Sequence, residues 1–314
     1  MDTEEIEAAE IPITERFQIA LDQLVVKLRA DTYVLGVILL GSMSHDVIWE
    51  KSDIDLLVIT QEVKHRQTSL SLTEEGVNIH AYMVTRTEFR RQIEGSLRSS
   101  FMHSMLSKGT LIYTRDETLR ELFDNRFEFG VLDRQIQALR YAVISLPALY
   151  KAEKWLRVKQ DLNYSALYIL FCANSIAGVE TVLHGEITGR EVVQQAIKYN
   201  PELFKVIYSD VLHGGSTEQT LEFAIEQIRT YLLERVPTVF QPILDYLAES
   251  ASVRSATEIN DHFHKHMQID CIETACEWLA DENIIRKVSA PVRVTEKSRV
   301  CVEESAYYYD SDSD

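Results

Sequence analysis

Two apolar runs joined through a glycine-serine turn constrain the fold of this chain more than any other feature of its sequence. The first run, Val34–Leu40, stops at Gly41-Ser42, and the second starts with Asp53 and Asp55 after an interval of ten residues. Runs of this length and composition are typical of buried strands. Residues two apart on a strand point to the same face. We therefore expect two strands, with both carboxylates projecting together at the second one.

The two carboxylates predict a metal site. Placing two such groups side by side is unfavourable unless a positive charge lies between them. Mg²⁺, or Mn²⁺ in its place, takes oxygen ligands of this kind. Gly41 lets a ligand approach the backbone closely, and Ser42 with the amides that follow can receive a phosphate at a helix start. The pattern therefore predicts a phosphate-bearing ligand, bound together with a divalent metal on Asp53 and Asp55.

Gly-Ser, ten residues and then Asp-x-Asp resembles the nucleotidyltransferase superfamily that includes DNA polymerase β and kanamycin nucleotidyltransferase. The spacing is closest to the minimal nucleotidyltransferase branch. The resemblance implies that Gly41 and Ser42 hold the outer phosphates of a nucleoside triphosphate, with ATP expected, and that Asp53 and Asp55 bind Mg²⁺. We also place Ser52, of the Ser-Asp-Ile-Asp motif, among the nucleotide-binding residues.

The implied fold class is α+β, in three parts. A mixed sheet with helices spans residues 11–130, an all-α bundle spans 131–236, and a small winged-helix-like domain spans 237–309. Residues 1–10 and 310–314 are acidic and are expected to be disordered. This layout is similar to that of bacterial nucleotidyltransferase-like proteins, whose family name does not indicate a substrate.

A third strand, Val77 to Val84, departs from the family pattern. Its residues alternate between an apolar face and a face that carries Asn78, His80 and Tyr82. The family places a third carboxylate at this point, and the positions here hold Asn78 and His80. A neutral imidazole is a poor Mg²⁺ ligand but a competent general base near pH 7. Three interpretations stay open: His80 is a base or positions the acceptor, the site binds nucleotide without turnover, or His80 only makes a hydrogen bond in the cleft.

Elsewhere in the first domain the pattern is simpler. Helical spacing of apolar residues predicts a first helix from Ile11 to Ala30 and a largely helical segment over residues 87–129. A short strand is expected at Thr110–Thr114 within that segment. The polar residues 61–75 are expected to form an irregular connection.

Residues 132–235 have a helical pattern throughout, with four or five amphipathic segments. In the kanamycin-type relatives a helical bundle closes the cleft and its first helix presents a lysine to the phosphates. The resemblance gives that role to Lys154. Lys151, Arg157 and Lys159 lie nearby, and the alternative is that all four cations occupy a solvated helix face.

Net charge and cysteine content limit the partners. The net charge is -17, and Lys plus Arg against Asp plus Glu number 14 to 22 in residues 1–130, 11 to 12 in 131–236 and 7 to 15 in 237–314. Strong electrostatic binding of nucleic acid needs clustered Lys and Arg, so large nucleic acids are disfavoured as partners. The four cysteines form no C-x-x-C pair, the start is acidic and no apolar run is long enough to span a membrane, which predicts a soluble, cytoplasmic protein.

The third helix of the winged-helix-like domain is expected between Gln268 and Glu282 and carries no Lys or Arg. A DNA-reading helix presents Arg, Lys, Asn or Gln to the groove. DNA binding is therefore disfavoured, and protein docking or formation of a homodimer is the preferred interpretation.

Two functions remain. The preferred one is transfer of a nucleoside monophosphate from a Mg-bound triphosphate to a small-molecule or protein acceptor. The alternative is a catalytically impaired nucleotide-binding regulatory protein that acts through its C-terminal domain.

Overall fold

The computed structural model describes residues 11–44, 48–96, 106, 108–124, 131–214, 217–250, 252–295 and 297–309. The segments expected to be disordered, 1–10 and 310–314, lie outside these ranges. The chain forms two compact units, Met1–Glu128 and Phe129–Asp314. The fold class is the expected one, a mixed sheet with helices followed by a helical region and a small sheet.

The first unit is built on a five-stranded sheet in the order β3-β4-β2-β1-β5. The β2–β4 pair is parallel and the other pairs are antiparallel. Its described elements are α1 (Ile13–Ala30), β1 (Val34–Leu40), η1 (Ser42–Ser44), β2 (Ile54–Thr60), β3 (Ser69–Glu74), β4 (Val77–Thr85), α2 (Arg86–Ser96), β5 (Thr110–Thr114) and α4 (Glu117–Asp124).

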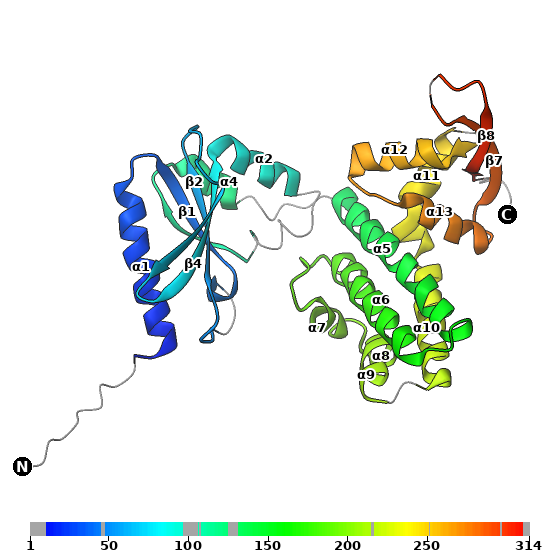
Figure 1. Cartoon of the computed structure of the whole chain (residues 1–314), viewed down its shortest axis with the longest axis horizontal. Helices are drawn as coiled ribbons and strands as arrows, with labels where there is room; N and C mark the ends of the chain where they lie inside the picture. Colours follow the sequence, from blue (N-terminus) through cyan, green and yellow to red (C-terminus); the bar gives the residue numbers. More distant parts are fainter. Residues whose placement is uncertain are drawn as a thin grey trace, which may run out of the picture. The chain divides into compact units, whose positions relative to one another are not determined.

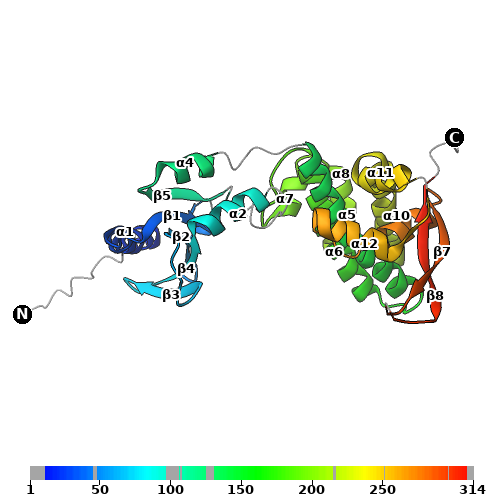
Figure 2. The ribbon, with the colours of Figure 1, turned by 90° about the horizontal axis from the view of Figure 1, so that it is seen from above.

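Helices cover both faces of this sheet (Figures 1 and 2). On one face, Phe17 and Leu21 of α1 pack with alternate residues of β1 and β2, such as Leu56. On the other face, Phe89 of α2 and Leu119 of α4 pack with the residues in between. Because both faces are covered, β1 and β2 consist almost entirely of apolar residues. Asp55, the second residue of β2, therefore interrupts an otherwise largely apolar strand.

The prediction of an irregular connection over residues 61–75 was wrong, because Ser69–Glu74 forms strand β3. It pairs with β4 in an antiparallel hairpin, Ser71 opposite His80 and Leu72 opposite Ile79. Glu75 and Gly76 both have positive φ, 50° and 72°, as a two-residue hairpin turn requires. The alternation of Leu70 and Leu72 with hydroxyl residues is the strand signal. The other predicted strands and the first helix are confirmed within one or two residues.

The second unit is largely helical, as expected. Its described elements are α5 (Val131–Arg157), α6 (Leu162–Leu183), α7 (Val192–Ile197), α8 (Pro201–Phe204), the π-helix η3 (Lys205–Asp210), α9 (Val211–His213), α10 (Glu218–Glu234), the π-helix η4 (Val236–Phe240), α11 (Gln241–Ser250), β6 (Arg254–Ser255), α12 (Ala256–Met267), α13 (Ile272–Asp281), β7 (Arg286–Arg293) and β8 (Cys301–Tyr308). Helices α5 and α6 pack closely at its centre (Figure 1).

One hydrophobic core runs through the whole second unit. Residues of α5 and α6 share it with Phe240, Ile243, Phe263 and Trp278, and Trp278 is 1% exposed. The two regions treated as separate domains in the sequence, 131–236 and 237–309, are thus joined by a continuous core. Element order alone cannot reveal such packing, since each region has helices with an apolar face of its own.

The prediction that no apolar run is long enough to span a membrane was wrong, because helix α6 is long and apolar enough by length and composition, the only such helix in the described residues. It is the central helix of this unit, and 67% of its most apolar stretch is buried among the neighbouring helices. Its composition is accounted for by this burial.

Candidate active site

Gly41 ends β1 in a conformation that only glycine adopts without strain. Its φ is 68°, and a Cβ placed on it would overlap the carboxylate of Asp55, whose Cγ would lie 3.2 Å away. The register explains the contact, since Leu40 and Asp55 are opposite each other on β1 and β2. After Gly41 the chain turns into η1, where the amide and the hydroxyl of Ser44 both donate to the Gly41 carbonyl, at 3.2 and 2.7 Å. The turn is therefore fixed against the acidic residue.

Asp53 immediately precedes β2, and Asp55 is the second residue of that strand. Ile54, Leu56 and Val58 are buried against α1, so Asp55, which alternates with them, projects toward the opposite face, as predicted. Both are partly exposed, and the Asp55 side chain is 24% exposed. Solvent access with a fixed position is what a metal ligand requires.

His80 is brought beside Asp55. Strands β2 and β4 run parallel with these two residues in register, and Nδ1 of His80 lies 3.8 Å from Oδ1 of Asp55. The imidazole is 41% exposed. Asn78, the other candidate for the missing carboxylate, pairs with Thr73 of β3 and is exposed. Of the two candidates, His80 is therefore the one in register with the aspartate strand.

An exposed polar strip next to His80 was not anticipated from the sequence. Tyr82, which is 40% exposed, shares the face of His80, and Ser69 and Ser71 of β3 lie opposite Tyr82 and His80 in the register. The strip became visible only once Ser69–Glu74 was known to be a strand. The alternation of residues 69–74 could have revealed it.

The two serines assigned to nucleotide binding lie on either side of the glycine and the aspartates. Ser42 is the first residue of η1, and its side chain is not among those described. Ser52 closes a turn: its amide donates to the Trp49 carbonyl at 2.9 Å, and its hydroxyl accepts from the Trp49 amide at 3.1 Å. This turn delivers the chain into Asp53. A direct contact of either serine with nucleotide stays a prediction.

Lys154 belongs to the second unit, in the last turn of α5. Its side chain is exposed and makes no ion pair or hydrogen bond among the residues that the structure describes. The neighbouring Glu153 is engaged by Arg229 at 2.7 Å. Glu153 is thus held inside the helical unit and is not available as a base, whereas Lys154 is free to meet a ligand. Its role toward a triphosphate stays a prediction.

The donor set fits a Mg²⁺ ion that depends on its substrate. Within the described part of the chain, no group of three or more His, Cys, Asp and Glu side chains could hold a metal. Mg²⁺ is commonly bound by one or two carboxylates, with substrate phosphates and water as the other ligands. Asp53 and Asp55 supply that minimum. His80, one of the two residues predicted at the position of the family's third acid, carries an imidazole, which adds little affinity for Mg²⁺.

Residues 22–118 match the family model described as "Polymerase beta, Nucleotidyltransferase". This segment forms a nucleotidyltransferase domain. It contains Gly41, both aspartates and His80, so the predicted resemblance to the superfamily is confirmed for this segment. No curated protein matches the chain.

Among solved structures, a nucleotidyltransferase-like protein from Exiguobacterium sibiricum superimposes with a TM-score of 0.63 at 17% identity. The alignment covers 93% of this chain and 99% of that one. At this identity the likeness concerns the fold, and it extends through both units. Family and fold together support a nucleotidyltransferase-like function.

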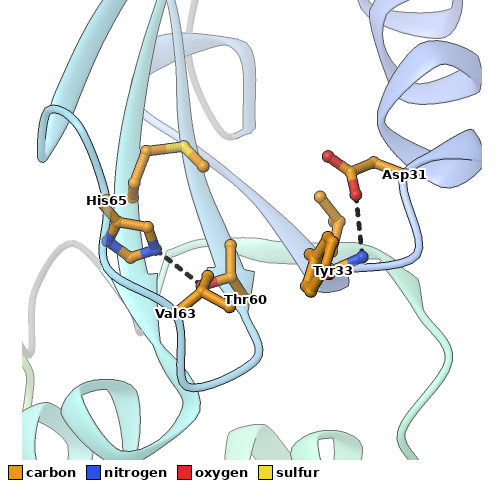
Figure 3. A pocket seen from close by; sticks show the side chains of 7 residues that line it. Asp31, Tyr33, Thr60, Val63 and His65 are labelled. Carbon is orange, nitrogen blue, oxygen red and sulfur yellow. Dashed lines mark hydrogen bonds between the residues drawn. The ribbon is translucent and has the colours of Figure 1, made fainter.

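A pocket of the first unit lies at the Thr60 end of β2, away from the aspartates (Figure 3). It has a volume of about 340 Å³, and its lining includes Asp31, Tyr33, Thr60 and His65. The His65 ring and the Thr60 hydroxyl are 2.7 Å apart, and the Asp31 carboxylate accepts from the Tyr33 amide. Thr60 is five residues beyond Asp55, roughly 17 Å along a strand. The pocket is therefore separate from the aspartate pair.

Proposed function

We propose that this protein transfers a nucleoside monophosphate from a Mg-bound triphosphate, with ATP preferred, to an acceptor hydroxyl. The acceptor oxygen attacks the α-phosphorus, the bond between the α-phosphorus and its bridging oxygen to the β-phosphorus breaks, and pyrophosphate leaves. The acceptor proton passes to a base. Bound Mg²⁺, or Mn²⁺, offsets the charge of the phosphates and aligns the α-phosphorus. The four cysteines are free and form no disulfide in the described residues, which supports a cytoplasmic setting.

The observation that carries the proposal is the joint placement of Gly41 and Asp55. A backbone turn with a positive φ lies directly against a partly exposed carboxylate, at the ends of two paired strands. We assign the metal to Asp53 and Asp55, and the outer phosphates to the backbone amides of the turn after Gly41. We assign Lys154 the role of neutralising the negative charge on pyrophosphate as it leaves.

We assign His80 the role of the base that takes the proton from the acceptor hydroxyl. Its ring lies beside Asp55 and remains 41% exposed, so it can meet a hydroxyl that approaches the α-phosphorus. A neutral imidazole accepts a proton near pH 7 without a metal. In this arrangement, Asp55 would help to hold the metal, and the ring beside it would take the proton.

The position of His80 also favours a second candidate function. Because an imidazole occupies the place of the third carboxylate, a site that binds nucleotide without turnover would look the same. Such a protein would report nucleotide levels through its C-terminal elements. The two candidates differ in whether pyrophosphate is produced.

The experiment is calorimetric titration of each triphosphate with and without Mg²⁺, joined to a pyrophosphate assay over candidate acceptors and intact mass measurement for self-modification. The proteins are wild type, Asp55→Asn, Asp53→Asn, His80→Gln and, as a control on the same strand face, Asn78→Ala. We expect both aspartate variants to lose Mg-dependent binding. His80→Gln should keep binding and lose turnover by about 10²- to 10⁴-fold, the usual contribution of a general base.

Three outcomes separate the candidates. Metal-dependent binding with pyrophosphate release that falls in His80→Gln supports the transferase. Binding without turnover for any acceptor supports the regulatory protein. Wild type that binds no triphosphate overturns both.

A further inference from the structure

The cations of the C-terminal region are concentrated in one hairpin. Residues 286–299 contain five of the seven Lys and Arg residues found between 237 and 314, but only one of its fifteen acidic residues. This segment comprises β7 and most of the turn before β8. We call β7, β8 and the turn between them the basic hairpin; β8 adds two acidic residues, Glu303 and Glu304, and Glu304 accepts from the Thr257 hydroxyl at 2.7 Å. Figures 1 and 2 show it at the edge of the helical unit. The count of 7 basic against 15 acidic residues over 237–314 hides this cluster, because nearly all of the acidic residues lie outside residues 286–299.

Four of the five cations are available to a partner. Lys287 is held by Glu277 at 2.5 Å. The other four are exposed and make no ion pair or side-chain hydrogen bond in the portion of the chain described, namely Arg286, Arg293, Lys297 and Arg299. Exposed valines accompany them, among them Val294 at 73% and Val300 at 66%. In a chain of net charge -17, such a surface selects for an anionic partner.

The acidic residues around α13 do not oppose such a partner as strongly as the sequence suggests. Helix α13 packs against α5, and its Trp278 is buried. Four of the five acidic side chains in this stretch are engaged within the unit: Asp270 with His264 at 2.7 Å, Glu277 with Lys287, Asp281 with the Tyr150 hydroxyl at 3.4 Å, and Glu282 with Arg229 at 3.5 Å. A contact with nucleic acid would thus involve the hairpin and not α13.

The shape of the hairpin distinguishes between anionic partners. Arg286 and Arg293 are seven residues apart on β7, so they lie on opposite faces of the ribbon and about 23 Å apart along it. The major groove of B-form DNA admits a two-stranded ribbon, and phosphates line both of its walls. A membrane surface is a plane and would meet only the tip or one face.

Strand addition by an acidic peptide is also disfavoured. Strand β7 is an edge strand of the sheet β6-β8-β7, but Pro291 in its middle has no N–H to offer. The hairpin therefore offers a partner its side chains and not its backbone.

We propose that the basic hairpin binds duplex DNA, lying in a groove with its four free cations on the phosphates of both strands. Backbone contacts of this kind are independent of base sequence. This DNA binding needs no bound nucleoside triphosphate and does not depend on the reaction proposed above.

The test is fluorescence anisotropy of the full-length protein with a labelled DNA duplex, without nucleotide, between 50 and 200 mM salt. Four phosphate contacts give a slope of about -3.6 in log K against log salt, a loss on the order of 10²-fold across this range. We expect a Kd of roughly 10⁻⁴–10⁻⁶ M near physiological salt. Arg293→Ala/Lys297→Ala/Arg299→Ala should bring the slope to about -1, and Arg293→Gln alone should lower its magnitude by about 1.

The matched control removes two arginines and one lysine from other exposed positions, as Arg66→Ala/Arg190→Ala/Lys265→Ala, and changes the net charge equally. It should bind as wild type does. Equal losses in the two triple variants, or no duplex binding by wild type at 50 mM salt, would overturn the proposal. Binding to vesicles rich in phosphatidylserine in place of DNA would also overturn it. Thermal melting of each variant checks that it is folded.

Discussion

Gly41 is the residue on which the geometry of the candidate site depends most. Two effects oppose any side chain there, the positive φ and the overlap with Asp55. We expect Gly41→Ala to lower the free energy of unfolding by more than the 1–2 kcal/mol typical of a left-handed alanine, and to weaken Mg-dependent nucleotide binding. Urea denaturation and calorimetry measure the two effects.

Gly76→Ala is the matched control for this variant. Gly76 has a similar φ of 72°, but a Cβ there meets nothing within 4 Å. It should show the backbone cost of about 1–2 kcal/mol alone and bind nucleotide normally. Equal effects of the two substitutions on stability and binding would mean that the contact with Asp55 is unimportant.

Asp116 makes the stability of the first unit depend on pH. Its carboxylate accepts from the Thr118 hydroxyl at 2.6 Å and from Arg86 at 2.9 Å, and the Thr118 hydrogen bond, with help from Arg86, lowers its pKa. A lowered pKa gives stability that is present above the unfolded-state value, about 3.9, and is lost as pH falls through the folded-state value.

We therefore expect Asp116→Asn to cost about 1–2 kcal/mol at pH 7, as for a hydrogen bond to a charged group, and the difference from wild type to shrink as pH falls through the lowered pKa of Asp116. Urea titrations at pH 7, 4 and 3 measure it. Glu117→Gln is the control, because Glu117 is 80% exposed and, among the described residues, pairs only with Arg120. A difference that is constant with pH would contradict the assignment.

At the scale of elements, α5 and α6 approach each other closely because α6 has a glycine where they meet. A Cβ on Gly178 would lie 2.5 Å from the ring of Tyr141 on α5, whose hydroxyl is 2.9 Å from the Thr188 hydroxyl. In a free helix, alanine would be favoured over glycine by about 1 kcal/mol. We expect Gly178→Ala to destabilise the protein by about 1–2 kcal/mol, because overpacking outweighs propensity.

A double-mutant cycle tests this explanation. In a Tyr141→Ala background the overlap is gone, so Gly178→Ala should stabilise the protein by up to about 1 kcal/mol. Additive effects of the two substitutions on the free energy of unfolding would show that the ring does not set the helix spacing.

Elements with a strong period could be predicted from sequence, and a mostly polar one could not. The first helix and β1, β2 and β4 follow from apolar periodicity, whereas half of β3 consists of serine and threonine. Its stability comes from pairing with β4 across the Glu75-Gly76 turn, which is a tertiary effect. The spacing of Asp53 and Asp55 could be read from the sequence, although β2 itself begins at Ile54, and their role toward a metal stays a prediction. The contacts of Asp55 with Gly41 and His80 required the strand register.

At the scale of the whole molecule, the shared core implies that the second unit unfolds as one body. Phe240 and Ile243 are fully buried against the bundle, although the sequence assigned them to a separate domain. We expect residues 129–314 to melt in one cooperative transition, and residues 129–236 alone to lose it, since the core would be exposed to water. Circular dichroism and calorimetry of the two fragments measure this.

The fragment 11–128 serves as the positive control, because its two hydrophobic layers are complete within the first unit. A cooperative transition of residues 129–236 at the temperature of the longer fragment would restore the three-domain description.

The contact between Gly41 and Asp55 also has an entropic consequence. A free aspartate at a strand end samples several rotamers, and a ligand that needs one of them must bear the loss of the others. Here the backbone of Gly41 on one side and the ring of His80 on the other already restrict the carboxylate. That ordering takes place when the sheet folds, so it does not diminish the affinity of whatever later binds there.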